Sequence, residues 1–177
     1  MAKHGVLFET DNFIKNCINR GAVATFDIDG GAPVVVGGVN ATDKELYNLT
    51  KYDDEAQVAI AYNPSVKYDV IGGNLFPAKS LDDRNYYNPA NKVVDIFIPE
   101  KNIEFGVTMA NIDGTTAPTV GQFLEPKADS TVFEIKSSQT TGVPSFEVIE
   151  IKEVKYPTFD FTEDVEKIYV VKTRFNG

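Results

Sequence analysis

The chain has 177 residues, with 17 basic and 26 acidic side chains and a formal net charge of −9 at pH 7. This acidic balance disfavours nucleic-acid binding, because contacts with phosphates need a basic surface. The single cysteine excludes an internal disulfide, and the single histidine excludes multi-histidine metal sites. No apolar run approaches the ~18 residues of a membrane span. We therefore expect no catalytic residue set, no cofactor, no bound metal ion and no membrane partner.

Residues 1–22 differ in character from the rest and are predicted to form a short N-terminal helical arm. Thr10 or Asp11 can cap a helix, and Gly21 can end it in the left-handed conformation. The apolar residues between these ends fall on one helical stripe: Phe13, Ile14, Cys17 and Ile18. Two interpretations stay open. The helix closes one end of the core, or its stripe docks on a partner protein.

From Val23 onwards the sequence predicts short strands separated by turns rich in Asn, Asp, Gly and Pro. In the longest run the alternation slips at Val148-Ile149, which predicts a bulge. About ten short strands with at most two helices indicate a mainly β fold, a β-sandwich or a β-barrel, over residues 23–177 as a single domain. The predicted strands are 23–28, 33–36, 58–62, 66–71, 93–98, 103–110, 120–124, 132–136, 146–156 and 165–174.

Residues 74–92 form the least regular stretch and are dominated by Asn, Asp and Pro. A long loop of this kind inside a compact domain is either a contact element or a segment laid over the core. Tyr86 and Tyr87 lie within it, and their rings would suit a carbohydrate-binding module if they were exposed.

The string Val23 to Gly30 resembles the first motif of haloacid-dehalogenase-type phosphatases, an apolar strand running into Asp-x-Asp-Gly. The resemblance implies a nucleophile at Asp27, a general acid or base at Asp29, and magnesium beside them. However, Gly31 stands where that family usually has Thr, and its fold alternates strands with helices. We therefore interpret both aspartates as turn residues and predict that the protein is not an enzyme.

The order of features resembles a family of tailed-bacteriophage virion proteins, the head decoration or capsid cement type. Three stretches carry this resemblance. The first is the N-terminal arm leading into residues 21–23 and then 31–37, the second is 57–69, and the third is 92–99 followed by 105–108.

The resemblance implies a non-enzymatic, β-rich protein that binds the outer surface of the assembled head and stabilises it by bridging capsid subunits. The partner would be the major capsid protein, with self-association into a trimer or another small oligomer. The N-terminus lacks the apolar core of a signal peptide, so we expect synthesis in the host cytoplasm and a final place on the virion exterior. The expected capsid-contact residues are Phe8, Phe13, Ile14 and Ile18. Another virion part, such as a head fibre base, a tail component or a carbohydrate-binding module, remains the alternative.

Overall fold

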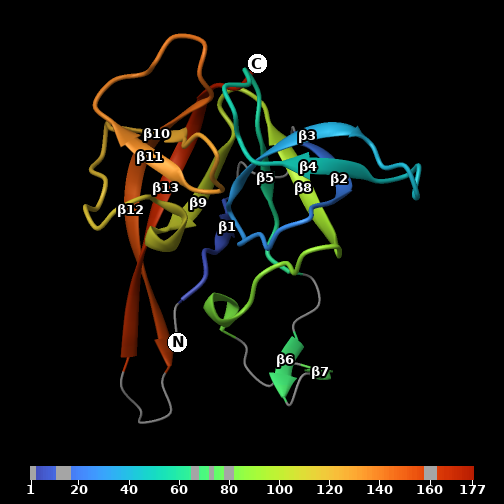
Figure 1. The fold of residues 1–177 in the computed structure, drawn as a ribbon. Helices are drawn as coiled ribbons and strands as arrows, with labels where there is room; N and C mark the ends of the chain where they lie inside the picture. Colours follow the sequence, from blue (N-terminus) through green and yellow to red (C-terminus); the bar gives the residue numbers. More distant parts are fainter. Residues whose placement is uncertain (1–2, 11–16, 65–67, 72–73, 78–81, 158–162) are drawn as a thin grey trace.

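The fold is mainly β, as the sequence predicts, and the described strands form two sheets and one separate hairpin (Figure 1). Eleven strands belong to the two sheets, and one of these sheets closes into a five-stranded barrel. The structure, a computed structural model, describes residues 3–10, 17–64, 68–71, 74–77, 82–157 and 163–177.

The larger sheet has six antiparallel strands in the order β1-β9-β13-β12-β10-β11. Its register shifts between Val148 and Glu150, so the predicted bulge is confirmed. In chain order its strands are β1 (Leu7–Glu9), β9 (Glu104–Thr108), β10 (Phe123–Pro126), β11 (Phe133–Lys136), β12 (Ser145–Pro157) and β13 (Glu163–Phe175).

The barrel closes in the order β2-β4-β3-β5-β8, with β2 and β4 parallel and the other pairs antiparallel. Its strands are β2 (Cys17–Val23), β3 (Pro33–Val39), β4 (Tyr47–Thr50), β5 (Ala59–Ala61) and β8 (Val93–Pro99). A barrel of so few strands has a narrow interior, which small side chains fill. Five buried alanines contribute to that core: Ala22, Ala24, Ala32, Ala59 and Ala61.

The remaining described elements are short and, in chain order, fall between strands of the two sheets. They are the hairpin strands β6 (Tyr68–Ile71) and β7 (Asn74–Pro77) and the helical turns η1 (Asp83–Asn85) and η2 (Met109–Asn111). Within the described ranges, no helix has both the length and the apolar character that a membrane crossing requires.

A second hydrophobic cluster joins the barrel to the six-stranded sheet. Phe97 of β8 meets Phe105 of β9 edge to face, with ring centroids 5.7 Å apart. Phe105 contacts Phe146 in the same way at 5.4 Å, and Phe146 contacts Phe133 at 5.6 Å. This row of buried rings packs one face of the sheet against the outside of the barrel.

The predicted N-terminal helix is not found in the described part of the chain. Its last residues, Cys17 to Arg20, belong to β2, and residues 11–16 lie outside the described residues. Every residue of β2 pairs with a residue of β8, so tertiary pairing outweighs the local helical spacing. The strand predicted over 23–28 is also largely wrong, because β2 ends at Val23.

Candidate interaction site

Of the four predicted contact residues, the structure describes Phe8 and Ile18, and these two lie in different sheets. Phe8 lies in β1 at an edge of the six-stranded sheet, where its side chain is half-buried. Ile18 lies in β2 of the barrel, opposite Ile98 in the register. Phe13 and Ile14 lie outside the described residues. The helix predicted to carry Ile18 is wrong at this residue, which lies in a strand, whereas the role of these residues in contacting a capsid stays a prediction.

Phe8 instead lines a shallow groove of about 350 Å³ on the face of the six-stranded sheet that points away from the barrel. Gly106 of β9 forms part of its floor, between Phe8 and Ile168. A Cβ atom at Gly106 would lie 2.6 Å from the Ile168 Cγ2 and 3.0 Å from the Phe8 Cβ. Only glycine lets these side chains close over the strand, so Gly106 fixes β1 against the sheet.

The most prominent projection of the molecule is a two-stranded extension of the six-stranded sheet (Figure 1). Strands β12 and β13 have 13 residues each, yet β10 pairs with β12 only at Phe146 and Glu147. Strand β9 pairs with β13 only from Ile168 to Lys172. Residues 150–157 of β12 pair with residues 163–170 of β13, and of the latter only 168–170 also pair with β9. The segments 150–157 and 163–167 therefore extend beyond the neighbouring strands. We call these two segments the ribbon.

One face of the ribbon combines exposed apolar side chains with charges of both signs. Ile151 is 37% exposed and Val165 is 47% exposed. The register places them on the same face, since Ile151 pairs with Tyr169, and Lys155 with Val165. Between them lies the cross-strand pair Glu153 and Lys167. Charged side chains of this kind discourage non-specific strand pairing at an open edge. Ile151 and Val165, in contrast, offer apolar contact area to a specific partner.

The ribbon is held by Arg84, whose side chain is only 4% exposed. Its guanidinium donates to Asp82 at 2.7 Å, to Asp164 at 2.9 Å and to Glu166 at 3.3 Å. The same group lies 3.7 Å from the ring centroid of Tyr156. Asp82 and Arg84 come from the loop around η1, whereas the other three residues belong to the ribbon. A buried arginine therefore fixes the ribbon to the loop.

The electrostatics of this cluster favour its ionised state. Burial opposes ionisation of Asp82, but hydrogen bonds from Arg84 outweigh it and hold the pKa of Asp82 below its ordinary value. The pKa of Asp164 is also lowered, first by its hydrogen bond from Lys3 and then by Arg84. The hydrogen bond to Asp82 is the largest factor raising the pKa of Arg84. Asp82, Asp164 and Arg84 are therefore all charged at neutral pH.

The N-terminal segment completes this cluster from a third direction. Lys3 forms an ion pair with Asp164, and the backbone N–H of His4 donates to the carbonyl of Arg84 at 2.8 Å. The His4 ring packs against Tyr87, with centroids 4.8 Å apart, and its Nδ1 lies 2.9 Å from Asp29 Oδ1. The loop, the ribbon and the N-terminal segment are thus joined at one place.

The two aspartates of the phosphatase-like string each hold a backbone amide. Asp27 accepts a hydrogen bond from the N–H of Ala90 at 2.8 Å, and Asp29 accepts one from the N–H of Gly5 at 2.8 Å. Both carboxylates therefore hold distant backbone segments, Asp27 the end of the irregular loop and Asp29 the N-terminal segment. In the described part of the chain, no group of three or more His, Cys, Asp or Glu residues is arranged to hold a metal ion.

The tyrosine pair of the irregular loop does not present two open rings. Tyr86 is 4% exposed, and Tyr87 is half-buried against His4. The loop itself is laid over the barrel, because Ile28 and Asn88 exchange backbone hydrogen bonds of 2.9 and 2.8 Å. Stacking of a sugar on both rings would need this loop to open.

Reasoning from the sequence missed both the ribbon and the contacts of Arg84 that hold it in place. The signal for the ribbon was the length of the last two strand runs, which no neighbouring run could cover. The role of Arg84 in holding the ribbon carried no signal, because Asp164 and Glu166 are far from Arg84 in the chain.

No protein-family model matches this chain, and a search of curated proteins finds no match.

Proposed function

We propose that this protein is a non-enzymatic decoration protein of a tailed-bacteriophage head. It would bind the outer surface of the assembled shell and stabilise it by bridging subunits of the major capsid protein, on the virion exterior. Self-association into a trimer or another small oligomer would multiply weak contacts over the lattice. The resemblance of residues 21–23, 31–37, 57–69, 92–99 and 105–108 to this class supports the proposal.

The observation that carries the proposal is the ribbon, whose position is fixed by the ion pairs of Arg84. A ribbon that extends beyond its neighbouring strands can reach a second protein while the body stays in place. Arg84 fixes its position before binding, so less conformational entropy is lost on association. Ile151 and Val165 supply exposed apolar area on one face. The ribbon replaces the N-terminal helix as the contact element that we propose.

The test is cosedimentation of purified protein with expanded head shells assembled without it. Wild-type protein should bind saturably, at a fixed ratio to the major capsid protein. The double variant Ile151→Glu, Val165→Glu should bind at least about tenfold more weakly, because a buried charge replaces apolar contact. Val93→Glu is the matched control, because Val93 is 61% exposed at the start of β8 in the barrel.

Both variants are compared with the wild type by thermal unfolding, so that a folding defect is recognised. Wild-type protein that does not bind these shells would contradict the decoration function and favour another virion part. Wild-type binding that the double variant retains would overturn the ribbon as the contact element.

A further inference from the structure

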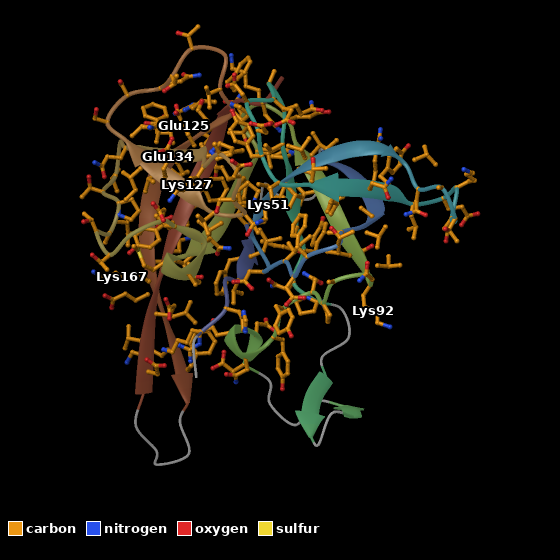
Figure 2. The ribbon with its side chains drawn as sticks, viewed as in Figure 1. Lys51, Lys92, Glu125, Lys127, Glu134 and Lys167 are labelled. Atoms are coloured by element: carbon orange, nitrogen blue, oxygen red, sulfur yellow. The ribbon has the colours of Figure 1, made fainter. Side chains whose placement is uncertain are left out.

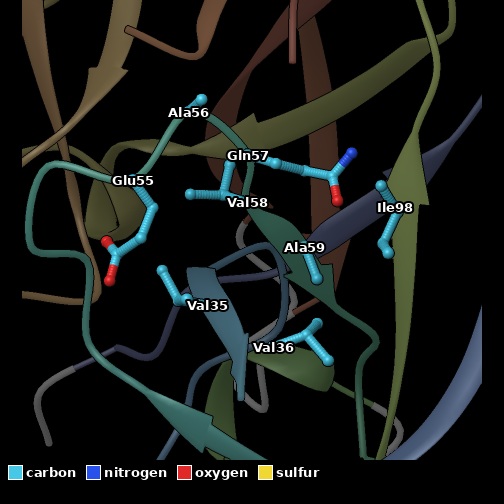
Figure 3. A pocket seen from close by; sticks show the side chains of 8 residues that line it. All are labelled: Val35, Val36, Glu55, Ala56, Gln57, Val58, Ala59 and Ile98. Carbon is cyan, nitrogen blue, oxygen red and sulfur yellow. The ribbon is translucent and has the colours of Figure 1, made fainter. Parts of the chain in front are cut away.

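One end of the barrel is open between β3 and β5. These strands pair at only two positions, Pro33 with Ile60 and Val34 with Ala59. From Val35 onwards β3 pairs with β4 instead, so β3 and β5 diverge. The divergence leaves a cavity of about 290 Å³, which we call the barrel mouth (Figure 3). Its apolar lining consists of Val35, Val36, Ala56, Val58, Ala59 and Ile98.

Acidic loops border the barrel mouth. Glu55 lies on its rim, and Asp53 and Asp54 precede it in the same loop. A second loop lies beside the first, because the N–H of Asp129 donates to the carbonyl of Tyr52 at 2.8 Å. Glu55 is the carboxylate that lines the mouth, and three more acidic residues, Asp53, Asp54 and Asp129, belong to its loop and to the adjoining loop.

Strands β10 and β11 add two further carboxylates beside Tyr52. Glu125 and Glu134 lie directly opposite each other in the register (Figure 2). Burial raises the pKa of the Tyr52 hydroxyl, and the charges of Asp54, Glu55, Glu125 and Glu134 raise it further. The Tyr52 hydroxyl thus lies in the field of carboxylates from both loop and strands.

Among the described residues, few cations offset this charge. Lys136 pairs with Glu134 at 2.8 Å. Lys51 lies over the ring of Phe26, with its Nζ 5.7 Å from the centroid, and Lys127 pairs with Asp113 at 2.8 Å. Figure 2 shows Lys92 well away from Glu125 and Glu134, at the other end of the barrel. Among the described residues, none of these lysines forms an ion pair with Glu55, the carboxylate that lines the mouth.

We propose that the barrel mouth is a docking site for a protein segment that presents an apolar side chain next to a lysine or arginine. The apolar side chain would enter the cavity between Val36 and Ile98, and the cation would reach Glu55 on the rim. A neutral apolar segment would leave the acidic rim unused, and an acidic one would be repelled.

The test uses the full chain labelled with 15N and two synthetic peptides, acetyl-Lys-Leu-Lys-amide and acetyl-Glu-Leu-Glu-amide. The basic peptide should shift the amide resonances of residues 35–36, 55–59 and 98. It should bind at least about tenfold more tightly than the acidic peptide at low salt, and the difference should shrink as salt is added.

Two variants separate the cavity from general charge attraction. The Glu55 carboxylate accepts a hydrogen bond from the N–H of Asp53 at 2.7 Å. Glu55→Gln removes the charge but keeps an oxygen that can accept this hydrogen bond. Ala56→Phe places a ring at the exposed rim and fills the mouth. Both should weaken binding of the basic peptide, whereas Glu45→Gln, at an exposed position in the loop before β4, should not.

Three results would overturn the proposal: no shifts at the mouth, equal affinity for both peptides, or binding that Ala56→Phe leaves unchanged. The titration contains no phage shell, so its failure leaves the decoration function standing. Conversely, failure of shell binding leaves the peptide result unaffected.

Discussion

At the scale of single residues, Arg84 does most to shape the molecule outside its core. Its side chain is 4% exposed and has carboxylate partners on two segments that are far apart in the chain. A buried guanidinium left without partners is costly, because it loses its hydration without compensation. Asp82 approaches Arg84 from its own loop, and Asp164 and Glu166 approach it from the ribbon. The ribbon therefore depends on a residue that is not part of it.

This dependence predicts a loss of stability in acid. The pKa values of Asp82 and Asp164 lie below their ordinary value of 3.8 in the folded protein. Their contribution to the free energy of unfolding is therefore fully present above that value and is lost as the pH falls through the lower folded pKa values. In urea denaturation between about pH 5 and pH 2, the wild type should lose stability more steeply than Arg84→Met.

The same variant should lower the free energy of unfolding at pH 7 by about 3 kcal/mol, because the carboxylates lose their buried cation and only Lys3 remains beside Asp164 and Glu166. Arg84→Lys keeps the charge but not the two-pronged contact with Asp82, so its loss should be intermediate. Parallel pH profiles for the wild type and Arg84→Met would contradict the role assigned to this cluster.

At the scale of elements, asparagine side chains join segments that share no strand pairing. Asn111 of η2 is 1% exposed, and its side chain donates to the carbonyl of Gly30 at 2.8 Å. Its Oδ1 accepts from the N–H of Thr108 at 3.2 Å. Asn63 similarly exchanges hydrogen bonds of 2.8 Å with the backbone of Leu7 in β1. The six-stranded sheet and the turn before β3 are therefore fixed by side-chain amides as well as by apolar packing.

We predict that Asn111→Ala lowers the free energy of unfolding by about 1–3 kcal/mol, because a buried carbonyl and a buried N–H lose their partners. The control is Asn48→Ala, since the Asn48 side chain is exposed and accepts from Asn40 at 2.8 Å. Exposed groups regain hydrogen bonds from water, so its cost should stay below about 0.5 kcal/mol. Urea denaturation of both variants measures the difference. Equal costs would show that Asn111 contributes no special link.

At the scale of the whole molecule, the two sheets share one hydrophobic cluster. Phe97 of the barrel is fully buried, and its ring contacts Phe105 of the six-stranded sheet. Val35 and Ile60 of the barrel belong to the same cluster as Val171 of β13. Neither sheet can expose this surface to water without losing a large part of its apolar burial. The barrel and the sheet should therefore unfold together.

Truncation of Phe97 tests this cooperativity. Phe97→Ala should lower the free energy of unfolding by about 3–5 kcal/mol through lost burial and a new cavity. Hydrogen exchange of β8 in the barrel and of β13 in the sheet should accelerate by similar factors. Faster exchange in β8 with unchanged protection in β13 would show that the two sheets unfold independently.

Sequence alone determined the properties that depend on neighbouring residues. Alternation of apolar and polar side chains has the period of a strand. It therefore predicted the mainly β class and the two long strands near the C-terminus, β12 and β13. The slip at Val148 located the bulge for the same reason. Tertiary structure decided what depends on distant partners. Cys17 to Arg20 have the spacing of a helix, yet they form a strand because β8 offers a complete set of backbone partners. The ion pairs that fix the ribbon form only because folding brings Arg84 to Asp164 and Glu166. No local sequence pattern encodes this long-range contact.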